Sequence, residues 1–442
     1  VLVRDVVGQR DGRRGEGAAA TGGAHLVIRR SEIARTRGAG IGVERATLEL
    51  ADSVVADTLP ERAGGVSGFG VRLGPGARAS VERVRVERPR TAGVATAWDA
   101  PAQLAVLDLA VRSPRRAPGG ASGLGLSFAP GARGTFARVE VTDAEGAGVD
   151  LSGEVTGTDL IVRDVRGAPR GGAGTGVYIG PAGIARVARV LVERASSEAI
   201  KVWGGGDAAF EDVVLRETGP DRYLFGETGA WVTEGSHLAL TRALIEDMGY
   251  AGVVVDGTHP EDPRRASSLE ATDVTIARVE GDSLVQLFGN GLRVMHGSRT
   301  RLRRVRIVEA REAAIVALNR GTRVEGEHVE ILATRMRACT ERETDRCASD
   351  VGGGCGLTAF DEGEIVLSRF RSADNALCGV MIAPRSSVTL SDGEIARNPI
   401  GANVQAPDYD LGRLSDEVRY LDNGRNYDGA RLPVPDDARP SL

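Results

Sequence analysis

The sequence predicts an all-β solenoid, because a strand–turn–strand unit recurs along it, apolar residues alternate within the unit, and the composition is rich in glycine. The clearest copy of the unit runs from Gly68 to Arg88, and similar copies occupy residues 123–141 and 174–194. Such self-similarity marks a repeat architecture. The 442-residue chain has 60 glycines and only 4% aromatic residues, which suits many tight turns around a core of small side chains.

Within one unit the apolar residues have the two-residue period of a β-strand. In the first strand we expect Val71 and Leu73 to point inward and Arg72 to point outward. In the second strand Val84 and Val86 have the inward positions. Each unit therefore contributes two strands to a common core.

Successive units align on a small residue near the start of the first strand. The aligned positions are Gly42, Gly70, Gly93, Gly125, Gly148, Gly176, Ala199, Ala230, Gly252, Leu284, Ala314, Gly356, Gly379 and Gly401. The short steps are 22 or 23 residues, a usual length for one coil of a parallel β-helix. Short steps alternate with steps near 28 to 32 residues, so the full repeat is a pair of coils. We expect about thirteen coils stacked at about 4.8 Å.

The pattern predicts one parallel β-helix over residues 1–400, with a disulfide-containing loop inserted at 338–354 and a C-terminal cap at 401–442. A solenoid must cover its last apolar layer, which is the role expected of the cap. Residues 409–418 are the one segment with helical spacing, through Leu411 and Leu414. The chain opens in mid-strand, so we interpret it as trimmed upstream, with any targeting segment outside this sequence.

The extra residues of the longer coils enter at one corner. The inserts are 59–65, 114–120, 168–172 and 219–226, and all four contain Gly and Pro. They would form a row of loops about 10 Å apart, two coil rises from one to the next. Repeat proteins often place insertions on a binding face, although such loops also simply complete an irregular corner.

The Gly-Val-x-Leu and Arg-Val-x-Val-Glu rows resemble those of right-handed parallel β-helix proteins, the superfamily that includes pectate lyases and polygalacturonases. Segments 401–410 and 422–428 are similar to the ends of uncharacterised β-helix repeat proteins predicted on the surface of myxobacteria and similar bacteria. The resemblance implies the architecture but not a chemistry, because one fold hosts many functions. The arginine and calcium-carboxylate motifs of the lyases and the paired aspartates of the polygalacturonases find no match here.

Four cysteines, Cys339, Cys347, Cys355 and Cys378, fall close together in the sequence. They lack the Cys-x-x-Cys pairs of a zinc site, and two disulfides in an exported protein are expected. Cys355 and Cys378 hold the same position in consecutive coils, within reach of a disulfide, which leaves Cys339 to pair with Cys347. The alternative is a set of buried free thiols in a cytosolic chain.

The charge pattern narrows the classes of partner. The net charge is −5, and arginines are interleaved with acids, so no basic face for nucleic acid is expected. No apolar run approaches the roughly 20 residues of a transmembrane helix. The Gly-x-Gly segments precede strands without a following helix, which excludes a dinucleotide-binding motif. We expect no cofactor and no metal. We expect an extracellular or cell-surface location, with lipid anchoring or the periplasm as possibilities.

One candidate site is a local repeat at 233–237 and 255–259, where an acid, a glycine, a hydroxyl residue and a histidine follow in the same order. Stacking these segments would place Glu234 beside Asp256, and His237 beside His259. Two carboxylates at that spacing match the roughly 5–5.5 Å of a retaining glycosidase, and a histidine–carboxylate cluster can also hold a metal. The same residues are ordinary turn chemistry at a strand end.

A second candidate site lies two residues after successive anchors, where Asp150, Tyr178 and Lys201 are expected to point outward. Trp203 should face the same way. An aromatic ring beside a cation and a carboxylate can stack on a sugar and bind its hydroxyl or acid groups. The alternative is an ordinary solvated row of side chains.

The function expected from these features is a non-enzymatic scaffold, secreted or at the cell surface. It would present the loop row and the strand face to a polysaccharide or a surface protein. The alternative is a polysaccharide lyase or glycoside hydrolase acting through Glu234 and Asp256. A second alternative is a purely structural spacer.

Overall fold

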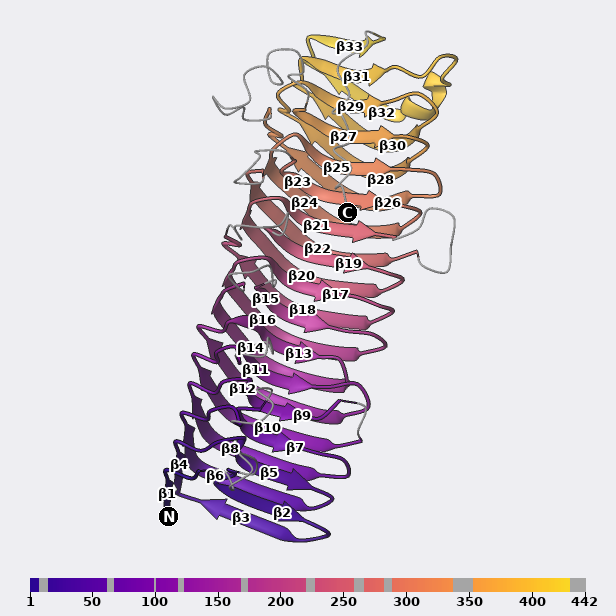
Figure 1. The fold of residues 1–442 in the computed structure, drawn as a ribbon. Helices are drawn as coiled ribbons and strands as arrows, with labels where there is room; N and C mark the ends of the chain where they lie inside the picture. Colours follow the sequence, from indigo (N-terminus) through magenta and orange to yellow (C-terminus); the bar gives the residue numbers. More distant parts are fainter. Residues whose placement is uncertain are drawn as a thin grey trace. The chain divides into compact units, whose positions relative to one another are not determined.

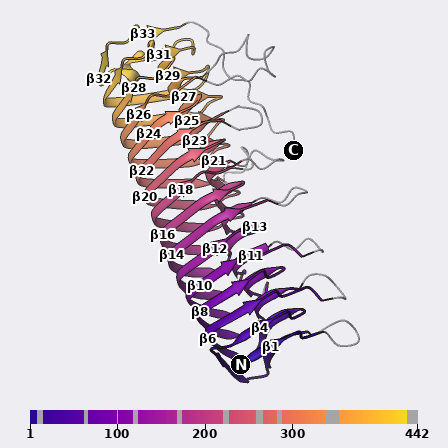
Figure 2. The same cartoon turned by 90° about the vertical axis from the view of Figure 1, so that its left-hand side faces the viewer.

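The computed structural model describes residues 1–7, 15–61, 67–98, 101–117, 123–167, 174–219, 227–257, 266–281, 288–336 and 353–429. The chain divides into two compact units, Val1–Gly226 and Glu227–Leu442, which we call the N-terminal and C-terminal units. Within each unit, short and long strands alternate along the chain and stack in two parallel sheets (Figures 1 and 2).

In the N-terminal unit the short-strand sheet contains β2 (Ala18–Thr21), β5 (Ala39–Glu44), β7 (Phe69–Leu73), β9 (Ala92–Thr96), β11 (Gly123–Phe128), β13 (Gly146–Leu151), β15 (Thr175–Ile179) and β17 (Glu198–Val202). The long-strand sheet contains β1 (Leu2–Arg4), β3 (His25–Arg29), β4 (Glu32–Ala34), β6 (Thr47–Ala56), β8 (Arg78–Glu87), β10 (Gln103–Arg112), β12 (Arg133–Thr142), β14 (Glu154–Val165), β16 (Ile184–Ala195) and β18 (Asp207–Arg216).

In the C-terminal unit the short-strand sheet contains β19 (Thr228–Thr233), β21 (Ala251–Asp256), β23 (Asn290–Met295), β25 (Ala313–Leu318), β27 (Cys355–Phe360), β29 (Cys378–Ile382), β31 (Ile400–Val404) and β33 (Arg425–Asp428). The long-strand sheet contains β20 (His237–Met248), β22 (Ser268–Val279), β24 (Arg299–Ala310), β26 (Arg323–Leu332), β28 (Glu364–Ala373), β30 (Ser387–Ala396) and β32 (Asp416–Leu421). The segment expected to be helical forms only a four-residue 3₁₀ turn, Leu411–Leu414, in which Leu414 is buried and Leu411 is exposed.

The predicted right-handed parallel β-helix is confirmed. Each strand pairs in parallel with its counterpart one coil away, as β8 does with β6 and β10, and crossovers between parallel strands of one sheet are right-handed in nearly all cases. Val71, Leu73, Val84 and Val86 are buried, while Arg72 is exposed. The two-residue period therefore identified the core correctly.

Strand register corrects three of the aligned positions. Gly70 is level with Gly40, because Ile41 pairs with Val71. Gly252 is level with Gly229, and Gly291 is the next equivalent residue. The predicted anchors Gly42 and Ala230 are therefore displaced by two residues and one residue, and Leu284 lies outside the described residues. Glycine is required at Gly40 because the next coil approaches closely: a Cβ there would lie 2.6 Å from the carbonyl oxygen of Gly70.

Two aromatic core residues are each matched by a glycine in a neighbouring coil. Phe136 pairs with Gly157, and Phe370 pairs with Gly393. A Cβ on Gly157 would lie 2.1 Å from Cζ of Phe136. The larger ring is thus accommodated by removing the side chain above it, which keeps the core filled without strain.

Gly157→Ala is expected to destabilise the N-terminal unit by about 1–3 kcal/mol, because the added methyl group overpacks against the buried Phe136 ring. Urea denaturation of the variant measures the loss. Gly219→Ala is the matched control, since a Cβ there meets nothing within 4 Å. Equal stabilities of the two variants would contradict this packing argument, and Phe136→Leu should rescue Gly157→Ala.

Two rows of left-handed residues run along the long-strand sheet. In the N-terminal unit the first row comprises Arg30, Asp52, Arg83, Asp108, Arg138, Asp159, Arg189 and Asp212, all with φ between 46° and 59°. Left-handed backbone is unusual for residues other than glycine, asparagine and aspartate. Sheet pairing skips these positions, as it does Asp52 and Arg83 between Ala51↔Glu82 and Ser53↔Val84. The row is therefore a stack of bulges, one in each coil.

Acid and base alternate along these bulges and pair between coils. The guanidinium of Arg189 donates two hydrogen bonds to Asp159, at 2.6 and 2.8 Å, and this contact lowers the pKa of Asp159 to about 2. A second row carries similar pairs, among them Arg194 with Asp164. The alternation repeats every two coils, which is a physical counterpart of the two-coil period in the sequence.

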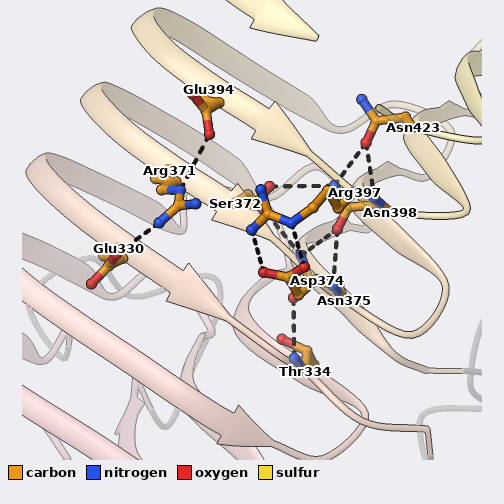
Figure 3. Close-up of polar contacts among 10 residues, drawn as sticks. All are labelled: Glu330, Thr334, Arg371, Ser372, Asp374, Asn375, Glu394, Arg397, Asn398 and Asn423. Atoms are coloured by element: carbon orange, nitrogen blue, oxygen red, sulfur yellow. Dashed lines mark hydrogen bonds and ion pairs between the residues drawn. The ribbon is translucent and has the colours of Figure 1, made fainter. Parts of the chain in front are cut away.

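The C-terminal unit contains a stack of asparagine amides, two of them buried, at the turn that follows the long strands (Figure 3). Asn375 donates from its side chain to Oδ1 of Asn398 at 2.9 Å, and Asn398 donates to Oδ1 of Asn423 at 3.1 Å. Each amide oxygen of the stack also accepts from a backbone N–H: Oδ1 of Asn375 from Thr334, Oδ1 of Asn398 from Asn375, and Oδ1 of Asn423 from Asn398. The stack satisfies buried polar groups of the turn, which would otherwise be costly.

Two further features stabilise consecutive coils in this region. Arg371 lies between Glu330 and Glu394, and Arg397 pairs with Asp374 (Figure 3). Cys355 and Cys378 are directly paired across β27 and β29 and form a disulfide with a Cα–Cα distance of 4.5 Å, as the register predicts. Cys339 and Cys347 lie outside the described residues, so their predicted pairing remains a prediction.

Candidate functional site

The register separates the two acidic residues of the first candidate site. Asp256 pairs with Thr233, so Glu234 lies one residue beyond the level of Asp256. Glu234 also follows the end of β19 with a φ of 54°. A one-residue offset between strands changes which face a side chain occupies. The expectation of two stacked carboxylates is therefore wrong, because Gly252 is level with Gly229 and not with Ala230.

Asp256 and His237 of this site have other partners. Nδ1 of His296 lies 2.7 Å from Oδ1 of Asp256, and Nδ1 of His237 lies 2.9 Å from the hydroxyl of Ser268. His259 lies outside the described residues. Among the residues that the structure describes, no three histidine, cysteine or acidic side chains are grouped closely enough to hold a metal ion. The direct stacking of Glu234 on Asp256 that the sequence led us to expect is not formed.

The second candidate site has the predicted register. Asp150 pairs with Tyr178, and Tyr178 pairs with Lys201, on β13, β15 and β17. Asp150 is not an exposed group, however: only 5% of it is accessible. Its carboxylate accepts hydrogen bonds from the hydroxyl of Ser127 at 3.1 Å and from the backbone N–H of Ser152 at 3.1 Å. The expectation that Asp150 faces a ligand from an open strand surface is corrected by this burial.

Asp150→Asn is expected to stabilise the protein at neutral pH. Burial raises the pKa of Asp150, with the serine hydrogen bonds opposing the shift. A carboxyl whose folded pKa is raised contributes stability that is complete below its unfolded pKa, near 4, and is lost as the pH rises through the folded pKa. The stability difference between variant and parent should therefore grow with pH above about 4. Thermal unfolding across pH 3–8 measures it; a difference independent of pH would contradict this assignment.

Lys201, the single lysine of the chain, is held in an ion pair. Its Nζ lies 2.7 Å from Oε1 of Glu198, whose side chain is 3% exposed. Thr175 donates to the other carboxylate oxygen at 3.0 Å. Burial would raise the pKa of Glu198, but the charge and hydrogen bond of Lys201, together with hydrogen bonds from Ser197 and the backbone, lower it. Lys201 therefore compensates a buried charge, a role that its sequence position alone did not indicate.

Two tryptophans occupy turns of the same type. Trp203 is half-buried in the turn between β17 and β18, and Trp98 is 63% exposed in the turn between β9 and β10. Trp98 was not singled out from the sequence, although its place before a long strand is the same. Of the predicted loop row, 59–61, 114–117 and Gly219 are described, and 62–65, 118–120, 168–172 and 220–226 lie outside the described residues.

The N-terminal unit carries an open groove across the starts of six long strands, β6 to β16. The groove has a volume of about 710 Å³. Its outward lining residues come in pairs, the first and third residues of each strand: Thr47 and Glu49, Arg78 and Ser80, Gln103 and Ala105, Arg133 and Thr135, Glu154 and Thr156, Ile184 and Arg186. We call this surface the six-strand groove. It runs across the strands, in the direction in which the coils stack.

Most charges in the six-strand groove are paired within the protein. Glu49 contacts His25 and Arg29 at 3.1 Å each. Arg133 pairs with Glu154 at 2.9 Å, and Arg186 pairs with Asp207 at 2.7 Å. The acidic groups of the groove are thus engaged by cations.

The neutral polar side chains of the groove make no such contacts within the described part of the protein. Within the described part of the chain, no hydrogen bond is made by the side chains of Thr47, Ser80, Gln103, Thr135 and Thr156. All five are exposed. Hydroxyl and amide groups on successive strands, about 4.8 Å apart, are therefore available to an external ligand.

The chain is a parallel β-helix protein, and comparison with solved structures finds others of that architecture. It is similar to a chain of the Vag8–C1 inhibitor complex, with 14% identity, 96% of this chain and 91% of that chain covered, and a TM-score of 0.44. It is also similar to pectate lyase Pel9A, with 11% identity, 81% of this chain and 71% of that chain covered, and a TM-score of 0.38. The receptor-binding domain of the siphovirus 9NA tailspike is similar at 11% identity, with 94% of this chain and 74% of that chain covered and a TM-score of 0.40.

No protein-family model matches the chain, and no curated protein matches it in sequence. Within the described residues, no helix has the length and apolar character needed to cross a membrane.

Proposed function

We propose that the protein is a non-enzymatic scaffold, secreted or at the cell surface, whose N-terminal unit binds a linear polysaccharide along the six-strand groove. The observation that carries this proposal is the row of unengaged hydroxyl and amide groups on consecutive strands. A polysaccharide presents repeated hydroxyl groups, and each can exchange hydrogen bonds with Thr, Ser or Gln side chains. A groove that crosses the strands suits an extended polymer better than a compact ligand.

Two observations favour binding without turnover. Glycoside hydrolysis uses a pair of carboxyl groups as acid and nucleophile or base. In the groove, Glu49 contacts two cationic or ionisable groups, and Glu154 is paired with Arg133. At the alternative site, Glu234 and Asp256 are offset. A lyase or hydrolase remains the competing function, tested below by product formation.

An exported location is supported by the disulfide between Cys355 and Cys378. Disulfides persist in oxidising compartments and are rare in the cytosol. The predicted second disulfide and the predicted loop row would strengthen this assignment. The partner we propose is a polysaccharide, with a surface protein as the alternative that the loop row would serve.

Ala105→Trp tests the groove, because Ala105 is an exposed lining residue at its centre and a large side chain would block it. We expect the purified protein to bind at least one polysaccharide of a broad panel and the variant to lose that binding. Ala239→Trp is the matched control: it changes the third residue of a long strand, β20, in the C-terminal unit.

Binding that Ala105→Trp leaves intact would overturn the assignment of the groove. Release of reducing ends or unsaturated products from a bound polymer would overturn the non-enzymatic function in favour of a hydrolase or lyase. No binding and no product across the panel would favour the structural spacer.

A further inference from the structure

We propose that Arg78 forms a subsite for an acidic substituent, a carboxylate or a sulfate ester, on the polysaccharide bound in the six-strand groove. This inference rests on the proposed function and specifies its ligand. Arg78 is the first residue of β8, is exposed, and lines the groove. It stands toward one end, with β6 on one side and β10 on the other.

Arg78 differs from the other cations of the groove in its electrostatic surroundings. Arg133 and Arg186 are each paired with an acid. For Arg78, the described part of the chain provides neither an ion pair nor a side-chain hydrogen bond. Its guanidinium keeps five donors available, in a planar arrangement that matches an oxyanion. The groove thus contains one uncompensated positive charge among neutral polar groups.

The neighbours of Arg78 are suited to complete the subsite. Thr47 and Gln103 are its register partners on β6 and β10, at about one strand spacing on either side. Ser80 is two residues along β8 and points to the same face. Their side chains have no hydrogen-bond partner among the described residues. A hydroxyl or amide beside the guanidinium can bind the sugar hydroxyls that flank an acidic group.

The location of Arg78 favours an acidic group on a polymer over a free anion. A small anion would find one exposed guanidinium with no enclosing wall, and such contacts in water are weak. A polymer already held by the rest of the groove brings its acidic group to Arg78 at high local concentration. The expected contribution of Arg78 is therefore selectivity among polymers of similar shape.

The test compares each acidic polysaccharide with its own neutral form. The carboxyl-reduced form serves for a uronate polymer and the desulfated form for a sulfated one, so the two arms identify the acidic group. Arg78→Gln should weaken binding of the acidic form by about tenfold or more, the usual effect of losing a charge-assisted contact. It should leave binding of the neutral form within about twofold.

Arg72→Gln is the matched control. Arg72 belongs to the same coil and is exposed, but it lies on β7 in the short-strand sheet. Its substitution by glutamine changes the net charge by the same amount. An equal loss with Arg72→Gln would assign the effect to overall charge and overturn the subsite. Equal binding of acidic and neutral forms by the parent protein would overturn it as well, while leaving the proposed function intact. Failure of both forms to bind would overturn the proposed function itself.

Discussion

Lys201→Ala is expected to lower the free energy of unfolding of the N-terminal unit by about 3–5 kcal/mol. The variant would leave the carboxylate of Glu198 buried without its cation, whereas in the parent protein the two groups are 2.7 Å apart. Breaking a buried ion pair on one side is far more costly than removing an exposed charge. Denaturant unfolding measures the loss, and hydrogen exchange of β15 and β17 should localise it.

The control for this prediction removes both charges. Glu198→Gln combined with Lys201→Met should recover most of the lost stability, because a neutral pair of similar volume carries no desolvated charge. If the single variant were as stable as the parent, or the double variant no better than the single, the buried pair would not be the cause.

Replacing Cys355 and Cys378 together by alanine is expected to destabilise the C-terminal unit by about 3 kcal/mol. The disulfide closes a sequence separation of 23 residues, and cross-linking a loop of this size restricts the unfolded chain by about that amount. Denaturation of the variant, followed through the exchange of β27 and β29 amides, measures the effect. Because Cys355 and Cys378 are 2% and 0% exposed, we also expect slow reduction of the folded protein.

Two outcomes would contradict the second prediction. The alanine variant could unfold at the same denaturant concentration as the parent protein, which would mean that strand stacking alone holds these coils. Alternatively, mild reductant could cleave the bond in the folded state as fast as in the denatured state, which would contradict its burial.

Much of the fold was predictable because the core imposes its pattern on every coil. A single two-residue period and a small anchor residue identified the strands and the inward residues, and they placed Cys355 opposite Cys378. Register failed after long inserts, where residue counting no longer fixes the alignment. An alignment error of one residue at Ala230 led to the prediction that Glu234 and Asp256 are stacked. In the structure, Asp256 pairs with Thr233 instead.

The candidate surfaces were harder to predict because outward residues have no common period. Asp150 occupies an outward position and yet is buried, which alternation alone cannot reveal. The groove is made of residues that resemble a plain solvated row, and only their lack of internal partners distinguishes them. The bulge rows did leave a signal: aspartate and arginine recur about 30 residues apart, as Asp159 and Arg189 do.

The pairing of phenylalanine with glycine between coils also bears on how the chain finds its native order during folding. Coils of nearly identical sequence can stack in the wrong order, a characteristic hazard of repeat proteins. Phe136 has Val106 on one side and Gly157 on the other, and Phe370 lies in the same way between Val329 and Gly393. The ring leans toward the glycine, where an added Cβ would lie 2.1 Å from Cζ of Phe136. A coil with a side chain in place of Gly157 would collide with the ring in this position, so each pair favours the correct order of the two coils.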